Sequence, residues 1–204
     1  MTALQPIPAG KLPMPKDDQE TTAFVREAMN AFAERTGLVG KQPPKRYLWT
    51  DAFAVCNLLE LQRRTGDNDY RELALRLVDQ VHHVLGRHHA DDPREGWISG
   101  LGEDEGERHP TKGGLRIGKP LRERGPDEPM DERLEWDRDG QYFHYLTKWM
   151  HALARVGRMT GDAHYLRWGT ELAETAYARF SYRPKSGVQR RMVWKMSIDL
   201  IKTP

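Results

Sequence analysis

Apolar residues recur at helical spacing along most of the 204-residue chain, and this pattern predicts a fold built from helices. A first helix is expected to begin at Asp17 and Asp18, which suit a helix start, and to end before Gly37. Its apolar face would be formed by Ala23, Phe24, Met29, Phe32 and Ala33. Two longer patterns follow, over residues 47–81 and 142–176.

These two longer segments are copies of one pattern, because they align without a gap at an offset of 95 residues. They share the word TGDxxY, in which Thr65, Gly66, Asp67 and Tyr70 correspond to Thr160, Gly161, Asp162 and Tyr165. Glycine takes the left-handed conformation that closes one helix, and aspartate then accepts hydrogen bonds from the free N–H groups of the next. Each segment is therefore predicted to form an antiparallel helical hairpin.

The rest of the chain divides around this hairpin-repeat domain, predicted over residues 17–182. Residues 1–16 are rich in proline and are expected to form an extended arm, and residues 183–204 to form a tail without a terminal helix. Residues 87–139 are dense in glycine, proline and charge, with hardly any helical periodicity, which predicts a long loop. Within this loop, Trp97, Ile98, Leu101, Leu115 and Ile117 indicate parts that pack against the helices.

Helical hairpins joined by TGDxxY, with aromatic-rich first helices and a long loop, resemble the six-hairpin glycosidase superfamily. The resemblance covers about residues 47–182. It implies an (α/α) toroid around a central cavity, as in unsaturated glucuronyl hydrolases and N-acylglucosamine 2-epimerase relatives. The helices at 48–63 and 141–158 would then be inner, and those at 68–85 and 163–179 outer.

A closed ring of six hairpins needs on the order of 240 residues in the hairpins alone. The sequence supplies two hairpins and an N-terminal helix. We therefore expect a barrel that is open or that is completed by another copy of the chain. The expected partners are accordingly a carbohydrate substrate and a second copy in a homo-oligomer.

Composition narrows the classes of function. The 32 Lys and Arg residues are interspersed with 30 Asp and Glu residues, which argues against a nucleic-acid partner. The single Cys56 excludes an intrachain disulfide. The first residues lack the pattern of a secretion signal, and no stretch approaches about 20 apolar residues, so a cytoplasmic location without membrane contact is expected.

Carboxylates at the starts of the two predicted inner helices are the candidate acid and base. The resemblance implies a pair of rim carboxylates, one protonated and one ionised. Asp137 and Asp139, with Glu135, precede the second inner helix, and Asp51 lies in the first turn of the first. The alternative for Asp139 is a helix N-cap, since acidic residues stabilise helix starts.

Aromatic residues beside these carboxylates are the candidate substrate platforms. Trp136 and Arg138 flank Asp137, which places a stacking plane and a guanidinium next to a carboxylate, a combination typical of sugar sites. Trp49, Trp97 and Tyr142 are the further predicted binding residues.

Two histidines support a different reaction, the epimerisation or isomerisation of a sugar. His144 and His151 lie seven residues apart and so share a helix face with Lys148. Histidine suits proton removal near neutral pH, and His144 would also serve in substrate binding. The alternative is a polar stripe or a core histidine.

Other suggestive stretches predict neither a metal nor a nucleotide cofactor. His82 and His83 are adjacent and point to different faces of a helix, so they do not form a metal-binding pair. The stretch GGLRIGKP lacks the spacing of a phosphate loop. Together with Arg122 and Arg124 just beyond it, the stretch, which contains Arg116 and Lys119, fits either an anionic substrate group or a solvated loop.

Three hypotheses follow from the sequence. The first is a glycoside hydrolase-like enzyme that uses Asp137 and Asp51, with the 87–139 loop over the site. The second is an epimerase or isomerase that uses His144 or His151. The third is a non-enzymatic helical repeat that binds a protein partner through its open edge.

Overall fold

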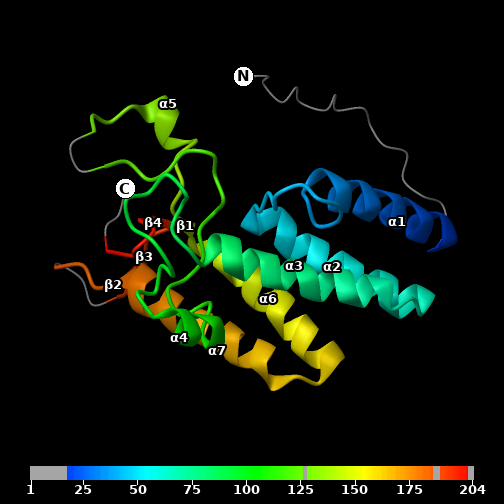
Figure 1. The fold of residues 1–204 in the computed structure, drawn as a ribbon. Coiled ribbons are helices and arrows are strands. Elements are labelled where there is room, and N and C mark those ends of the chain that lie inside the picture. Colours follow the sequence, from blue (N-terminus) through cyan, green and yellow to red (C-terminus); the bar gives the residue numbers. More distant parts are fainter. Residues whose placement is uncertain (1–17, 126–127, 186–188, 202–204) are drawn as a thin grey trace.

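The computed structural model describes residues 18–125, 128–185 and 189–201, and helices dominate these segments (Figure 1). The predicted arm at 1–16 and the helix start at Asp17 lie outside the described residues. The helices are α1 (Asp18–Arg35), α2 (Leu48–Thr65), α3 (Asp69–Leu85), α4 (Glu103–Arg108), α5 (Glu132–Glu135), α6 (Phe143–Thr160) and α7 (Ala163–Phe180). The strands are β1 (Gln141–Tyr142), β2 (Ser181–Tyr182), β3 (Arg191–Met192) and β4 (Lys195–Met196). The predicted all-α class is confirmed.

The turns of the two hairpins, α2/α3 and α6/α7, are closed by the same backbone geometry. Gly66 and Gly161 both have a left-handed φ of 74°, and each N–H bonds to the carbonyl oxygen four residues earlier. The hydroxyl oxygens of Thr65 and Thr160 accept from the backbone N–H two residues on, at 3.2 and 3.1 Å. The turn prediction is therefore confirmed, and the threonine has a role in it as well.

The aspartate of each turn starts the second helix of its hairpin. Asp162 is the N-cap of α7, and its Oδ1 accepts from the N–H of His164 at 2.9 Å. Asp67 makes the equivalent bond to the N–H of Asp69 at 3.0 Å, although the N-cap position of α3 is Asn68. The same aspartate hydrogen bond therefore occurs in both hairpins, but α3 begins one residue later relative to its aspartate than α7 does.

The two hairpins lie side by side, with α2 packed against α6 (Figure 1). Helix α3 packs on α2, α7 packs on α6, and α1 covers a further side of α2. The first helices of the hairpins are therefore neighbours. None of the helices in the described part of the chain is both long enough and apolar enough to cross a bilayer.

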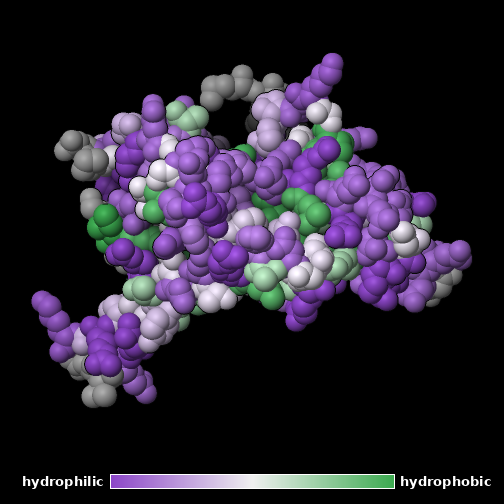
Figure 2. Space-filling model, turned by 60° about the horizontal axis from the view of Figure 1, so that its bottom comes forward, coloured by the Kyte–Doolittle hydropathy of each residue, from purple (hydrophilic) through white to green (hydrophobic). Residues whose placement is uncertain are grey.

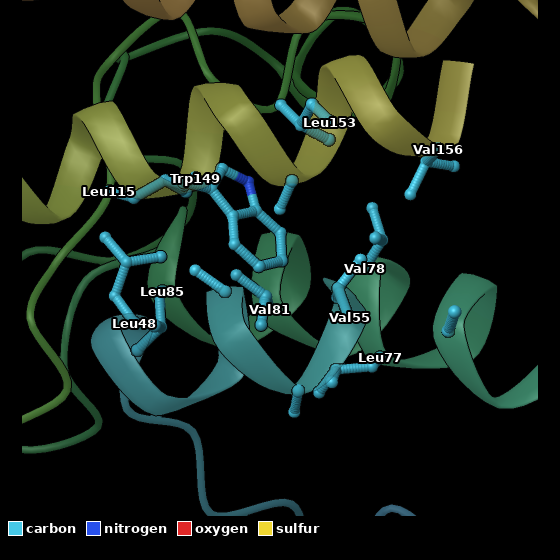
Figure 3. Packing of buried hydrophobic residues seen from close by; sticks show 14 of the residues in the cluster. Leu48, Val55, Leu77, Val78, Val81, Leu85, Leu115, Trp149, Leu153 and Val156 are labelled. Carbon is cyan, nitrogen blue, oxygen red and sulfur yellow. The ribbon is translucent and has the colours of Figure 1, made fainter. Parts of the chain in front are cut away.

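One apolar core joins the hairpins. Trp149 points from α6 between α2 and α3, where Val55 and Val81 lie near it (Figure 3). All three side chains are fully buried. Burying one large apolar side chain contributes about 1.5–3 kcal/mol, so this shared core holds the hairpins together. The face of the molecule in Figure 2 is mainly hydrophilic, with separate apolar areas between polar side chains.

The centre of the long 87–139 excursion is fixed between the hairpins. Arg116 donates its N–H to the carbonyl oxygen of Leu85 at the end of α3, at 2.9 Å. The carbonyl oxygen of Ile117 accepts from Leu48 at the start of α2, and its N–H bonds to Gly140 at 2.8 Å. Ile117 and Trp97 are buried, so the predicted packing of this region is confirmed. The segment also contains α4 and α5, which its weak periodicity did not predict.

The described part of the C-terminal tail forms short strands beside the start of α6. Strand β4 pairs antiparallel with β1, so that Gln141 lies opposite Met196 and Tyr142 opposite Lys195. Strand β3 pairs with β2 in the same sense. Together with the long excursion, these strands gather at one end of the helical array (Figure 1).

Candidate functional site

Aromatic side chains cluster where α2 and α6 begin. The hydroxyl groups of Tyr47 and Tyr145 are 2.7 Å apart, which joins the two helix starts directly. Trp49 packs against Tyr145 and His144, with ring centroids at 5.0 and 5.8 Å. Tyr142 stacks on His144 with centroids 5.4 Å apart. The structure thus brings three predicted binding residues, Trp49, Tyr142 and His144, into one cluster.

A cleft of about 180 Å³ opens beside this cluster. Its lining consists of Arg124, Met130, Glu135, Trp136, Tyr142, Trp194 and Lys195. Trp136 and Trp194 are 68% and 59% exposed, while Tyr142 between the helix start and β4 is buried. Trp194 stacks on Tyr142 at 5.2 Å, with an interplanar angle of 19°. Two exposed indoles around one cleft make it the candidate binding surface, because large apolar patches exposed on a protein surface are often functional.

Two lysines flank the Tyr142 ring. Lys119 Nζ lies 5.3 Å from the centroid of this ring and donates to the Tyr142 hydroxyl at 3.2 Å. It also donates to the Trp136 carbonyl oxygen. Lys195 Nζ lies 5.9 Å from the Tyr142 centroid and donates to the Glu135 carbonyl oxygen at 3.3 Å. Burial lowers the pKa of Lys195, and the positive charge of Lys119 lowers it further.

The Glu135 carboxylate in the cleft wall is held by arginines. Arg124 Nε donates to it at 2.9 Å, and Arg138 Nε lies 3.5 Å from it. Arg138 also pairs with Glu128 at 2.8 Å. The guanidinium of Arg138, a predicted substrate ligand, is therefore already engaged by two carboxylates.

Asp51 does not face the cleft. Its side chain is 1% exposed, and its Oδ2 accepts from the backbone N–H of Tyr47 at 2.9 Å, which ties it to the start of α2. Its Oδ1 lies 3.7 Å from Arg46 Nη1. Burial raises the pKa of Asp51 to about 7, against the opposing effect of Arg46 and the Tyr47 hydrogen bond. This environment favours a structural role over contact with a substrate.

The two other candidate aspartates lie in contrasting environments. Asp139 is buried, pairs with Arg116, and accepts from the N–H groups of Gly118 and Gly140, both at 3.0 Å. It is not an N-cap, because the N-cap position of α6 is Tyr142. Asp137 is exposed next to Trp136 on the surface.

The remaining predicted residues are dispersed. His151 is exposed on α6 two turns beyond His144, on the face that both share with exposed Lys148. Trp97 is 2% exposed and lies under the Arg87 guanidinium, whose Cζ is 4.3 Å from the ring. It lines a different cavity from the cleft beside Tyr142. Trp97 is therefore separated from the other predicted sugar-binding aromatics.

Trp194 and Lys195 also line this cleft, although the sequence does not predict them as site residues. The signal present is the alternation of apolar and polar side chains in WKMSIDL, which is typical of a strand. The pairing of β4 with β1 then places Lys195 opposite Tyr142. This pairing joins residues more than fifty positions apart, so no local pattern indicates it.

Neither metal-site geometry nor comparison with known proteins assigns a function to this cleft. Within the described segments, no group of three or more His, Cys, Asp or Glu side chains is arranged to hold a metal ion. No protein-family model matches the chain, and neither the curated proteins nor the solved structures contain a match to it.

Proposed function

We propose that the protein is a carbohydrate-active, glycoside hydrolase-like relative of the six-hairpin glycosidases, with its two hairpins forming part of an (α/α) toroid. The observation that carries this proposal is the cleft bounded by exposed Trp136 and Trp194 over Tyr142. Sugar rings present apolar C–H faces that pack on aromatic rings, while their hydroxyls need polar partners. Lys195, Arg124 and Glu135 in the same lining supply such partners.

The arrangement of the helices supports the same proposal. Helices α2 and α6 contact each other, as inner helices of neighbouring hairpins would. The aromatic cluster joins their N-terminal ends through Tyr47 and Tyr145. The cleft therefore lies where a toroid would place its rim, next to the long excursion.

Asp137 is the proposed acid or base. It is exposed and follows Trp136 directly, whereas Asp51 and Asp139 are buried in ion pairs. Glu135 in the cleft wall, two residues before Asp137, is the proposed second carboxylate, and its Oε1 accepts from Arg124 Nε at 2.9 Å. A hydrolytic role would thus rest on Asp137 together with Glu135.

Isothermal titration with neutral sugars, amino sugars and uronates tests the binding step. We expect one class to bind, and Trp136→Ala and Trp194→Ala to weaken its affinity about tenfold each. Tyr177→Ala is the matched control, because Tyr177 is an aromatic residue 61% exposed on α7 and away from the cleft lining. Unchanged affinity in both tryptophan variants would contradict the proposal.

Hydrolysis is tested separately with Asp137→Asn. If Asp137 acts as acid or base, this variant should bind the sugar normally and lose most of its turnover, by about 100-fold or more. Normal turnover in Asp137→Asn would remove Asp137 from the reaction and leave the binding proposal intact.

His144 supports a second candidate, a sugar epimerase or isomerase. Its ring stacks on Tyr142 next to the cleft, and burial, followed by the charge of Lys148, lowers its pKa. A neutral imidazole at pH 7 is available as a base. In this case His144→Ala or His151→Ala would abolish turnover, whereas Asp137→Asn would spare it.

Exposed apolar side chains support a non-enzymatic alternative, in which the helical repeat binds a protein partner through its open edge, here a second copy of the chain. Phe53 on α2 and Leu166 on α7 are each 46% exposed, although both lie on helices of the shared array. Light scattering of the purified protein distinguishes this case. A dimer that Phe53→Ser converts to monomer would support it, and a monomer at all concentrations would exclude it.

A further inference from the structure

A second cavity, of about 100 Å³, lies between the outer helices α3 and α7 under residues 97–110. It shares no lining residue with the aromatic cleft. Its walls include Trp97, Tyr165, Trp168 and His82, and its lining also contains Asp79 and Glu107. None of the functions considered above uses this cavity.

The rings around the cavity meet at right angles. Trp168 is perpendicular to Tyr165, with an interplanar angle of 85° and centroids 5.3 Å apart. It is also perpendicular to His82, at 87° and 5.0 Å. A ligand placed between perpendicular rings contacts aromatic surface on more than one side. Such surfaces attract an organic cation through the negative faces of the rings.

The walls themselves carry little positive charge. Burial lowers the pKa of His82 to about 3, so its ring is neutral, and its Nε2 accepts from the Trp149 indole N–H at 3.1 Å. Trp97 already has one cation against its ring, because the Arg87 guanidinium lies 4.3 Å from the centroid. Tyr165 and Trp168 are therefore the aromatic walls that remain for a ligand cation.

Carboxylates at the mouth of the cavity complete the pattern. The side chains of Asp79 and Glu107 are 69% and 45% exposed. His83 lies between them, with Nε2 2.8 Å from Glu107 and Nδ1 3.3 Å from Asp79. Arg87 also approaches Glu107, at 3.6 Å, and pairs with Glu103. Three carboxylates therefore surround one guanidinium and one imidazole, which leaves the mouth negative whenever His83 is neutral.

We propose that this cavity binds a small organic ammonium group, such as a methylated amine, with the cation against Tyr165 and Trp168 and the carboxylates of Asp79 and Glu107 at its mouth. A bare metal ion fits the site poorly, since aromatic rings replace the oxygen ligands that hard cations require. A methylated ammonium group carries a positive charge and an apolar surface of methyl groups. The carboxylates of this site complement the charge, and the aromatic rings complement the methyl groups.

Calorimetric titration at pH 8 with choline and with 3,3-dimethylbutan-1-ol separates charge from shape. The alcohol has the same branched head group without the charge. We expect choline to bind in the millimolar range and the alcohol to bind at least tenfold more weakly. Equal binding of both ligands, or no binding of choline, would overturn the proposal.

Substitutions locate the site. Tyr165→Leu keeps apolar volume but removes one ring, and it should weaken choline binding about fivefold or more. Tyr177→Leu alters an exposed tyrosine on the same helix outside the cavity and should leave the affinity unchanged. If Tyr165→Leu does not unfold cooperatively, Glu107→Gln at the exposed mouth replaces it. Wild-type affinity in a folded variant of either kind would overturn the proposal.

The pH dependence gives an independent check. Burial lowers the pKa of His83, but its hydrogen bonds to the Asp79 carbonyl oxygen and to Glu107 outweigh this and leave the pKa raised. Protonated His83 competes with a ligand cation for the same carboxylates. The other basic side chains near the cavity are Arg87, 3.6 Å from Glu107, and Arg71, whose charge acts on Tyr165. Choline affinity should therefore rise severalfold from pH 6 to pH 8. A constant affinity would exclude Asp79 and Glu107 from cation recognition.

Discussion

The two hairpins share their turn but differ in what they bury. Both turns repeat the same threonine, glycine and aspartate hydrogen bonds. Helices α2 and α3 nevertheless bury a carboxyl group, Asp51, and an imidazole, His82, whereas the buried positions of α6 and α7, two fully described helices, include no acidic or basic side chain. The turn depends on residues close in sequence and therefore recurs with the sequence repeat. The buried polar groups instead pair with residues outside their own hairpin.

Asp51 and His82 each make a connection beyond their hairpin. Asp51 faces Arg46, from the linker before α2, and His82 accepts from Trp149 of the second hairpin. Helix α3 buries residues along most of its length, whereas α7 buries Leu172, Ala176 and Phe180. The first hairpin is therefore the central unit, to which the linker and the second hairpin attach.

The largest expected effect comes from Trp149→Ala, which removes the connection between the hairpins. The variant loses a fully buried indole and its hydrogen bond to His82, so the free energy of unfolding should fall by about 3–5 kcal/mol. Urea unfolding at pH 7 measures this. The exposed Tyr177→Ala should change it by less than about 1 kcal/mol. Two separate transitions in the wild type would show that the hairpins unfold independently and would contradict the shared core.

The next effect concerns pH and the two buried groups of the first hairpin. The folded-state pKa of Asp51, about 7, lies above its ordinary value of 3.8, so the native state binds the extra proton and stability falls as pH rises from about 4 to 7. The folded-state pKa of His82, about 3, lies below 6.5, so the unfolded state binds the extra proton and stability falls as pH drops from about 6.5 to 3. The two contributions oppose each other between about pH 4 and 6.5.

Single substitutions should separate these contributions. Relative to wild type, Asp51→Asn should gain stability steadily as pH rises through this range, by up to about 1.4 kcal/mol per pH unit. His82→Gln should gain relative to wild type as pH falls. Urea unfolding at half-unit pH intervals measures both differences. Parallel profiles for wild type and variants would mean that neither group titrates differently on folding.

A smaller effect tests the shared turn. Gly66→Ala and Gly161→Ala each place a side chain at a left-handed φ of 74°, with no neighbouring atom within 4 Å of the new methyl group. Both should lose about 1 kcal/mol from backbone strain alone. Gly102→Ala is the control, because Gly102 has a φ of −64° and equal space. Clearly unequal losses at Gly66 and Gly161 would mean that the two turns are not energetically equivalent.

The smallest effect concerns the exposed ion pair between the hairpins. Arg155 Nη2 on α6 lies 3.8 Å from Glu60 on α2, and both side chains are a third exposed. Arg155→Gln removes this pair and leaves Glu60 paired with Arg63 and Arg64 of its own helix. It should change the free energy of unfolding by less than about 1 kcal/mol, since such pairs are screened by water and salt. Urea unfolding in low and in high salt measures the change. A loss of stability larger than this would mean that the surface ion pair helps to hold the hairpins together.

Local signals in the sequence predicted the hairpins well. The TGDxxY word and the 3.6-residue periodicity gave α2, α3, α6 and α7 with boundaries within two residues, because capping and amphipathic burial depend on nearby positions. The aromatic cluster was predicted only in part. Trp49, Tyr142 and His144 come together because α2 packs on α6, and that packing follows from the repeat.

Contacts between distant segments were not predictable in this way. The sequence predicts Asp51 and Asp139 as site residues, since a carboxylate at a helix start looks the same in sequence whether or not a buried arginine faces it. Their partners, Arg46 and Arg116, became identifiable only in three dimensions. The cleft residue Trp194 likewise depends on the pairing of β4 with β1.

Residues 115–117 divide the long excursion into two shorter loops. Because this segment is hydrogen-bonded to Leu85, Leu48 and Gly140, the chain returns to the helical array halfway through. Residues 87–114 cover the outer helices, and residues 118–139 lead to the aromatic cleft. The two loops thus share one anchor and also contact each other, since Arg94 of the first lies 3.3 Å from Glu123 of the second. A protease cut in one loop would therefore leave the other attached through residues 115–117.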